Sequence, residues 1–256
     1  MKIVIVGSGN IASFFAKKLH IKHKIIQIIS KDINHAKQLA SQYHCQYANQ
    51  IEQIHQDTDV IIFALKDDVL LQIANSYSFQ DKLIIHTAGS IHLDEIKNIS
   101  NHIASIWCVY SIQKEMLPLS ESVPIVINAN TEDSLLNVNV IAQSISQNIF
   151  HFNDEQKSFL HLAAVFANNF TNHLYSLSQQ ICDEQNINFD VLKPLIQNTA
   201  EKVKHANPAL IQTGPAIRHD QQTMDKHLQL LQTETLKKIY HLLSFSIQQK
   251  KEKYRT

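Results

Sequence analysis

Two kinds of apolar pattern alternate through the first 152 residues of the chain, and this alternation restricts the fold more than any other feature. Short β-branched runs of the kind found in buried parallel strands are separated by stretches of helical periodicity. The predicted strands are residues 2–6, 24–30, 60–65, 83–86, 103–107 and 124–128, with a short one near 149–152. The predicted helices are residues 11–19, 33–43, 67–77, 93–99 and 132–147. Because such alternation implies right-handed crossovers, we predict an α/β fold with a doubly wound, mostly parallel sheet.

The second half of the chain follows a different pattern. From Asp154 to Lys250 the β-branched runs stop, and helices are predicted near residues 154–185, 189–205 and 220–249. Asn207-Pro208 and Gly214-Pro215 interrupt them. We therefore predict two domains, one of residues 1–152 with the sheet and an all-helical one of residues 153–256. The first helix has an apolar face over 159–174, which is either intramolecular core or a subunit contact.

Composition argues against several classes of protein. Lys plus Arg (23) equals Asp plus Glu (23), whereas nucleic-acid binding or a polybasic membrane anchor needs surplus cations. The longest apolar runs span about five to seven residues, far short of the roughly twenty that cross a bilayer. The three cysteines are far apart and no histidines form a zinc-ligand motif, so we expect neither a metal site nor a disulfide framework. No cleavable leader is evident, and a cytoplasmic protein is expected.

A glycine-rich loop follows the first predicted strand. Residues 7–12 read G-x-G-x-x-A, between predicted strand 2–6 and predicted helix 11–19, as in the Rossmann dinucleotide-binding fold. Gly7 allows the tight turn, Gly9 lets a pyrophosphate approach the backbone, and Ala12 lets the helix pack closely on the strand. The alternative is a short strand-to-helix turn without a ligand. The expected coenzyme contacts here are Gly7, Ser8, Gly9, Asn10 and Ile11.

The end of the second predicted strand indicates which coenzyme is bound. An acidic residue there would bind the ribose 2′-hydroxyl of NAD, but this strand ends in Ser30-Lys31 and an acid follows only at Asp32. A hydroxyl and a cation suit the 2′-phosphate of NADP. We therefore expect NADP, with NAD as the alternative. Ser30 is otherwise a cap for the following helix, a role that Asp32 could also fill.

Two more loops should line the same crevice, because they follow neighbouring strands. After the third main strand come Ala64, Leu65 and Lys66, and after the fourth come Ala88 and Gly89, where glycine permits close approach of the backbone. Ser90 is either a ligand contact or the cap of the next helix.

Five segments resemble a known family, in order and at family-like spacing: KIVIVGSGNIA, FALKDD, HTAGS, HLAAVFANNF and TGPAIRHD. They are similar to Rossmann-type proteins with a C-terminal domain named DUF2520, often labelled NADP oxidoreductases of the coenzyme F420-dependent kind. This group is related to pyrroline-5-carboxylate reductase, ketopantoate reductase and the 3-hydroxyacid dehydrogenases. The resemblance covers about residues 2–232 and implies a Rossmann domain followed by a helical domain that often dimerises, hence a homodimer. No motif indicates a site for coenzyme F420 itself.

The resemblance also implies a substrate site, with departures. Dehydrogenase relatives place a proton-donating lysine and an asparagine one helical turn apart, and these positions correspond to Val165 and Asn169. His161 lies four residues before Val165 and could replace the missing lysine, because an imidazole transfers protons near neutral pH. Arg218 offers a planar fork to a carboxylate or phosphate; its alternative is an internal contact with Asp220. The segment 107–113 keeps little of the family's Tyr-Pro-x-Gln-Thr-Phe pattern.

Together these features predict an NADP(H)-dependent oxidoreductase that acts on a small carbonyl, imine or hydroxy compound. His161, Asn169 and Arg218 are the candidate catalytic residues. The alternatives are a dinucleotide-binding sensor that has lost its proton donor and a helical dimerisation module with a structural Rossmann half. The sequence contains no motif that identifies the substrate.

Overall fold

The computed structural model describes residues 1–114 and 123–253, and the chain divides into two compact units, residues 1–168 and 169–256. The last strand ends at His151. The domain boundary predicted at residue 152 therefore lies directly after the last strand of the sheet. That the first domain ends there stays a prediction.

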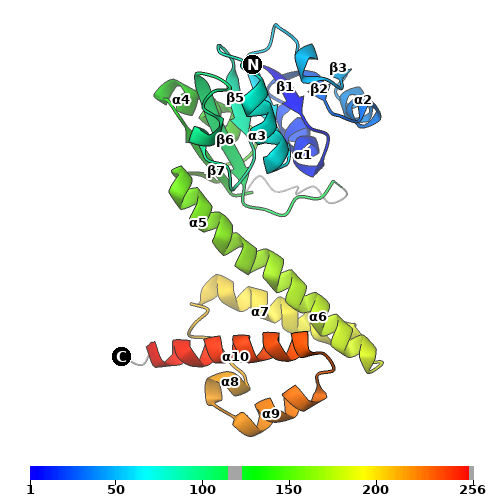
Figure 1. The fold of residues 1–256 in the computed structure, drawn as a ribbon, viewed down its shortest axis with the longest axis vertical. Helices are drawn as coiled ribbons and strands as arrows, with labels where there is room; N and C mark the ends of the chain where they lie inside the picture. The colour runs from blue at the N-terminus through cyan, green and yellow to red at the C-terminus, as the bar shows by residue number, and fades with distance from the viewer. Residues whose placement is uncertain (115–122, 254–256) are drawn as a thin grey trace. The chain divides into compact units, whose positions relative to one another are not determined.

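The first unit contains an eight-stranded sheet with strand order β3-β2-β1-β4-β5-β6-β7-β8. Its strands are β1 (Lys2–Val6), β2 (Lys24–Ile29), β3 (Gln46–Ala48), β4 (Val60–Phe63), β5 (Leu83–His86), β6 (His102–Cys108), β7 (Ile125–Ala129) and β8 (Ile149–His151). The predicted α/β, mostly parallel, doubly wound Rossmann sheet is confirmed. Helices cover both faces (Figure 1).

Two details of the sheet were not predicted. β6 and β7 are antiparallel. The prediction of a mostly parallel sheet did not say which pair this would be, because a short apolar run indicates burial but not strand direction. β3 was missed, since only Ala48 of its three residues is buried and it therefore has no apolar run.

Helices α1 (Asn10–Leu19), α2 (Ile33–Ser41) and α4 (Glu132–Gln143) pack on one face of the sheet. The fully buried Phe14 and Phe15 are central there, and the burial of each side chain stabilises the fold by roughly 1.5–3 kcal/mol. Helix α3 (Asp67–Ser76) and the 3₁₀ turn η2 (Leu93–Ile96) pack on the other face, and η1 (Ile51–Gln53) lies near its edge. The helix predicted at 93–99 is wrong in type: it is only this single 3₁₀ turn.

Helix α5 (Asp154–Ala164) closes the first unit and continues into a π-helix, η3 (Val165–Phe170). A capping box starts α5: the Asn153 side chain accepts from the Gln156 amide, and Gln156 Oε1 accepts from the Asn153 amide.

The second unit contains helices alone among its described residues. They are α6 (Thr171–Glu184), η4 (Phe189–Leu192), α7 (Lys193–His205), α8 (Pro215–Arg218), α9 (Gln221–Leu230) and α10 (Glu234–Lys253). The single helix predicted at 220–249 is therefore wrong, because the helix is interrupted between Leu230 and Glu234. Thr233, in this interruption, accepts a hydrogen bond from the Leu236 amide. Within the described ranges, no helix is long and apolar enough to cross a bilayer.

Candidate active site

The crevice expected for a ligand lies where the strand order reverses, between β1 and β4. Gly7 directly follows β1 and has a φ of +127°, a conformation that favours glycine. A Cβ on Gly7 would lie 2.3 Å from the carbonyl oxygen of Ala64, the residue that follows β4. The loops after these two strands therefore meet at Gly7, and only a glycine fits between them.

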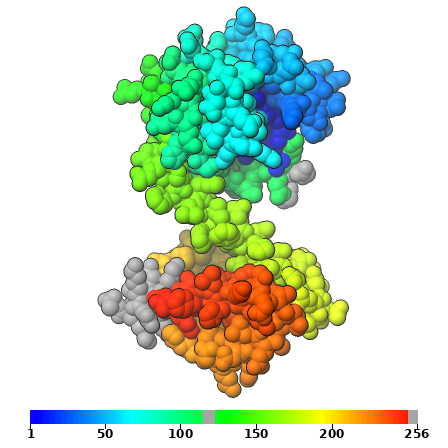
Figure 2. Space-filling view, viewed as in Figure 1, coloured from blue at the N-terminus to red at the C-terminus, as the bar shows by residue number. Residues whose placement is uncertain are grey.

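The amino end of α1 opens at this crevice. Gly9 is the N-cap residue, no side chain caps the helix, and no acidic residue lies in its first turn. Gly9 and Asn10 are exposed, and a Cβ on Gly9 would meet no atom within 4 Å. In Figure 2, dark-blue atoms of the first residues are visible in a hollow between cyan and lighter blue atoms. The first-turn amides can therefore receive an anion, which the helix dipole favours.

Ser30 lies beside this loop, since its Oγ is 2.7 Å from Ser8 Oγ. The cap of α2 is Asp32, whose carboxylate accepts from the amides of Asn34 and His35 and thereby holds the pKa of Asp32 below its usual range. The alternative role of Ser30 as the helix cap is therefore wrong. Lys31 is exposed at the same strand end.

The loops after β4 and β5 are linked to each other. Ser90 Oγ donates to the Asp67 carboxylate, and the Thr87 amide donates to the Phe63 carbonyl oxygen at 3.2 Å. Ser90 is therefore not a helix cap, because the residue that caps η2 is His92. Ala64 and Leu65 are half-buried, whereas Lys66 is exposed at the start of α3.

His161 lies against the loop after β5. A Cβ on Gly89 would lie 2.8 Å from Cδ2 of His161 and 2.9 Å from Cε2 of Trp107. The rings of His161 and Trp107 make an edge-to-face contact with centroids 5.4 Å apart. A half-buried imidazole, the chain's only tryptophan and a predicted coenzyme loop therefore meet at one point. Trp107 was not predicted as a site residue, because the segment 107–113 that contains it keeps little of the family pattern.

Asn169 lies in the π-helix. Hydrogen bonds in a π-helix join residues five apart rather than four apart. His161 and Val165 keep α-helical spacing, because the Val165 amide donates to the His161 carbonyl oxygen, whereas Val165 and Asn169 both lie in the π-helix. Asn169 is exposed and begins the second unit. π-Helical turns are frequent at functional sites.

Arg218 is exposed at the end of the short helix α8 in the second unit. Its charge acts on Asp220, although the pKa of Asp220 is lowered mainly by hydrogen bonds from the side chain and amide of Thr223. Gly214 and His219 both have positive φ, so the predicted turn is tight at each end of α8.

A fully buried histidine, His86, ends β5 next to the same loop. Burial lowers the pKa of His86 to about 3, with the Lys157 charge acting in the same direction and Asp154 against it. His86 is therefore neutral at physiological pH. Its signal in the sequence is a polar residue at the end of an apolar strand run, LIIH.

This histidine makes the fold acid-sensitive. The unfolded imidazole titrates near pH 6.5 and the folded one near pH 3, so protonation favours the unfolded chain as the pH falls below 6.5. We expect the free energy of unfolding to fall by about 2 kcal/mol between pH 7 and pH 5 because of this group. Urea unfolding at several pH values measures it, and His86→Gln should flatten the dependence. An equal pH dependence in both proteins would contradict this assignment.

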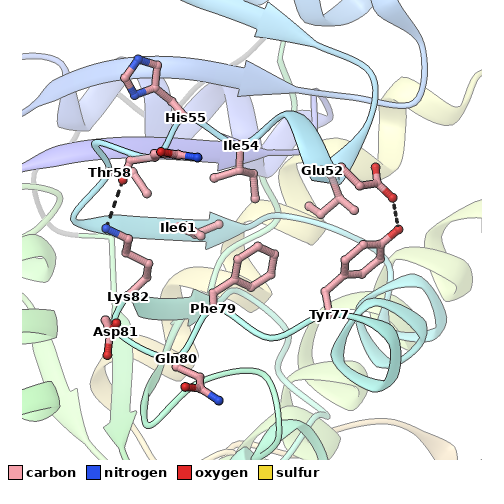
Figure 3. Close-up of a pocket in the computed structure, with 12 residues that line it drawn as sticks. Glu52, Ile54, His55, Thr58, Ile61, Tyr77, Phe79, Gln80, Asp81 and Lys82 are labelled. Carbon is pink, nitrogen blue, oxygen red and sulfur yellow. Dashed lines mark hydrogen bonds between the residues drawn. The ribbon is translucent and has the colours of Figure 1, made fainter.

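Another hollow, of about 360 Å³, lies at the amino ends of β4 and β5, whereas Gly7 lies at the carboxyl end of β1 (Figure 3). Tyr77 Oη donates to the Glu52 carboxylate on one side, and Lys82 Nζ donates to the Gln56 carbonyl oxygen at 3.2 Å on the other. Between them lie apolar side chains, including Ile54, Ile61 and Phe79. Ligands of such sheets bind at the carboxyl ends of the strands, so the crevice at Gly7 is the candidate site. No group of metal-ligating side chains occurs in the described ranges.

Comparisons with known proteins agree with this geometry. A family model described as NADP oxidoreductase, coenzyme F420-dependent, matches residues 2–89, and a domain of unknown function, DUF2520, matches residues 123–247. The crystal structure of a candidate NADP oxidoreductase from Bacteroides fragilis is 32% identical in sequence. The similarity covers 97% of this chain and 98% of that chain, with a TM-score of 0.89. Among curated proteins, none matches.

More distant structures share the fold alone. The pyrroline-5-carboxylate reductase of Streptococcus pyogenes is 15% identical over 97% of this chain and 98% of that chain, with a TM-score of 0.66. An imine reductase from Myxococcus stipitatus, in complex with NADP⁺, is 12% identical over 97% of this chain and 92% of that chain, also with a TM-score of 0.66. The present chain belongs to the family of Rossmann-type NADP oxidoreductases that carry a C-terminal DUF2520 domain.

Proposed function

We propose that the protein is an NADP(H)-dependent oxidoreductase that reduces or oxidises a small carbonyl, imine or hydroxy compound. The observation that carries the proposal is the uncapped amino end of α1, which opens beside Gly7 at the point where the strand order reverses. Relatives of the same fold include an imine reductase in complex with NADP⁺ and a pyrroline-5-carboxylate reductase, which supports this class of substrate.

The proposed coenzyme site uses three loops. The residues that hold the pyrophosphate are Gly7, Ser8, Gly9, Asn10 and Ile11, and those that line the remaining crevice are Ala64, Leu65, Lys66, Ala88 and Gly89. Ser30 and Lys31 bind the 2′-phosphate, and the Ser30–Ser8 contact supports this by joining the strand end to the phosphate loop. Asp32 caps α2, so its carboxylate already has partners.

His161 is the proposed proton donor. When bound, the coenzyme supplies or accepts hydride at its nicotinamide ring. The contact of His161 with the Gly89 loop supports a role for its imidazole, which would give a proton to the substrate oxygen or nitrogen during reduction. Asn169 and Arg218 are proposed, from the resemblance alone, to bind the substrate through an amide and a guanidinium group.

The test is a titration with NADPH and NADH that follows the fluorescence of Trp107. We expect NADPH to bind at least about tenfold more tightly than NADH, because the ammonium of Lys31 pairs with the 2′-phosphate. Lys31→Ala should remove most of this preference and leave NADH binding unchanged. Tighter binding of NADH would assign recognition to Asp32, and no binding of either nucleotide would exclude the proposed function.

A second candidate is a dinucleotide-binding sensor without catalytic activity. Val165 favours it, because the dehydrogenase relatives carry their proton-donating lysine at this position. Tight binding of NADPH with no turnover of carbonyl or imine compounds would support the sensor, whereas turnover that is lost in His161→Ala would support the enzyme.

We further propose a cytoplasmic homodimer. The three cysteines are far apart in the sequence and form no disulfide framework motif, which suits a reducing compartment. In residues 169–249 only Cys182, Ala216, Met224 and Leu236 are buried apolar side chains, whereas Leu195, Leu210 and Leu242 are at least 60% exposed. A second copy would cover this apolar surface. Sedimentation equilibrium should give twice the chain mass of 29.3 kDa, and a monomer at all concentrations would contradict it.

A further inference from the structure

A row of polar side chains crosses three neighbouring strands beneath α5. His86 on β5 pairs in register with Ser105 on β6, and Ser105 pairs with Asn128 on β7. Directly paired residues project from the same face of a sheet. Trp107, two residues after Ser105, projects from this face as well. His86 and Ser105 are completely buried, in a position where apolar residues are the rule.

The first turn of α5 supplies charged partners for this row. Lys157 is completely buried, and its Nζ lies 2.9 Å from Oδ1 of Asp154 and 2.7 Å from the carbonyl oxygen of Ile91, to which it donates. Asp154 Oδ2 accepts from the Leu93 amide at 2.8 Å, and the Asp154 carboxylate also accepts from Asn128. The ion pair therefore joins α5 both to the segment after Gly89 and to the sheet.

A further hydrogen bond lies on the same side of the helix. His92 Nε2 and Ser158 Oγ are 2.9 Å apart. Three hydrogen bonds thus join the first turns of α5 to residues 91–93, only a few residues beyond the loop that His161 touches.

The cluster also contains donors and acceptors that remain free for further hydrogen bonds. Both ring nitrogens of His86 and Ser105 Oγ have no hydrogen-bond partner within the described chain. A neutral imidazole offers one donor and one acceptor, a hydroxyl offers both, and an ammonium has a third N–H beyond the two used here. Donors and acceptors can therefore be satisfied together by ordered water, as is usual for buried polar groups.

Lys157 and His161 lie four residues apart on α5, so they occupy the same side of the helix in successive turns. His161 is the residue that contacts Gly89 and Trp107. We propose that the buried Asp154–Lys157 ion pair, with His86 and Ser105, is a positioning device that holds α5 on the sheet and thereby keeps His161 at the Gly89 loop. Its value for catalysis rests on the proposed function, but the contact itself does not.

A buried ion pair is a poor source of stability compared with apolar packing, whereas removal of only one partner is strongly destabilising. In some proteins a buried ion pair provides conformational specificity, because its charges are satisfied in only one register. Here the Asp154–Lys157 ion pair fixes the register and rotation of α5, and these determine the position of the His161 imidazole one turn later.

The experiment reads the environment of Trp107, the chain's only tryptophan, by acrylamide quenching of its fluorescence in the full-length protein without coenzyme. We expect Lys157→Met to raise the quenching of Trp107 to the value of His161→Ala, because both remove the imidazole from the indole. The double variant Lys157→Met/His161→Ala should show no further increase. Lys204→Met is the matched control: Lys204 pairs with Glu201 at the same i,i+3 spacing, but both are exposed.

Two results would overturn the proposal: quenching in Lys157→Met equal to wild type, or effects of the two substitutions that add. If Lys157→Met does not fold, Asp154→Asn/Lys157→Met removes both charges and is expected to fold with the same raised quenching. Failure of both variants to fold, judged by circular dichroism, would assign the pair to the fold as a whole and also overturn the proposal. Because no coenzyme or substrate is used, a failure here is distinct from a failure to bind NADPH.

Discussion

Gly9→Asp is expected to weaken NADPH binding at least about 100-fold while the protein stays folded. The new carboxylate would project from the amino end of α1 into the place of the pyrophosphate. Two like charges about 4 Å apart repel by about 4 kcal/mol at an effective dielectric constant of 20. The fold should tolerate the side chain, because Gly9 has a φ of −79° and a Cβ there meets no atom within 4 Å.

Fluorescence titration measures the NADPH affinity, and circular dichroism with thermal unfolding measures the fold. Gly9→Ala separates bulk from charge: the methyl group alone should weaken binding less than the carboxylate does. If Gly9→Asp binds NADPH as tightly as wild type does, the pyrophosphate does not lie on this helix end.

Gly7→Ala is expected to affect the fold rather than coenzyme binding alone. We expect a large loss of stability whether or not coenzyme is present. The added Cβ would lie 2.3 Å from the Ala64 carbonyl oxygen, and the φ of +127° disfavours any side chain. Backbone strain and displacement of the loop after β4 should together cost about 3 kcal/mol or more. Urea unfolding monitored by circular dichroism gives this value.

Gly9→Ala is the matched control for Gly7→Ala, because it introduces the same methyl group two residues away into open space. We expect its free energy of unfolding to lie within about 0.5 kcal/mol of wild type. A loss of less than about 1 kcal/mol in Gly7→Ala would show that the loops after β1 and β4 can separate without strain.

Local sequence signals predicted the part of the fold that holds the coenzyme loops. The strands at 2–6 and 83–86 have the predicted bounds, because buried β-branched runs are bounded by polar or glycine residues there. Gly7 was predicted from its motif, and its positive φ and its approach to Ala64 agree with the turn expected of it.

Other features depend on tertiary context that a sequence window lacks. The antiparallel pairing of β7 depends on the path of the chain, and the π-helix at Val165–Phe170 looks like an ordinary amphipathic helix in sequence. Lys157 was overlooked because a lysine is usually exposed, and its burial depends on the ion pair with Asp154 and the hydrogen bond to the Ile91 carbonyl oxygen.

The candidate site was predictable to a similar degree. Ser30 was expected to bind the 2′-phosphate of NADP from its position at a strand end, and it lies beside Ser8 of the glycine-rich loop. Its competing role as a helix cap could be excluded only once Asp32 was seen to hold the amides of α2. The contact between His161 and Gly89 joins residues 72 positions apart, which helical periodicity cannot predict.

The most direct measurement is a crystal structure of the protein grown with NADPH. The diphosphate should accept hydrogen bonds from the main-chain amides of residues 9–11, with the 2′-phosphate between Ser30 and Lys31. Electron density for the nucleotide elsewhere, or none at millimolar NADPH, would contradict the assignment of this crevice as the coenzyme site.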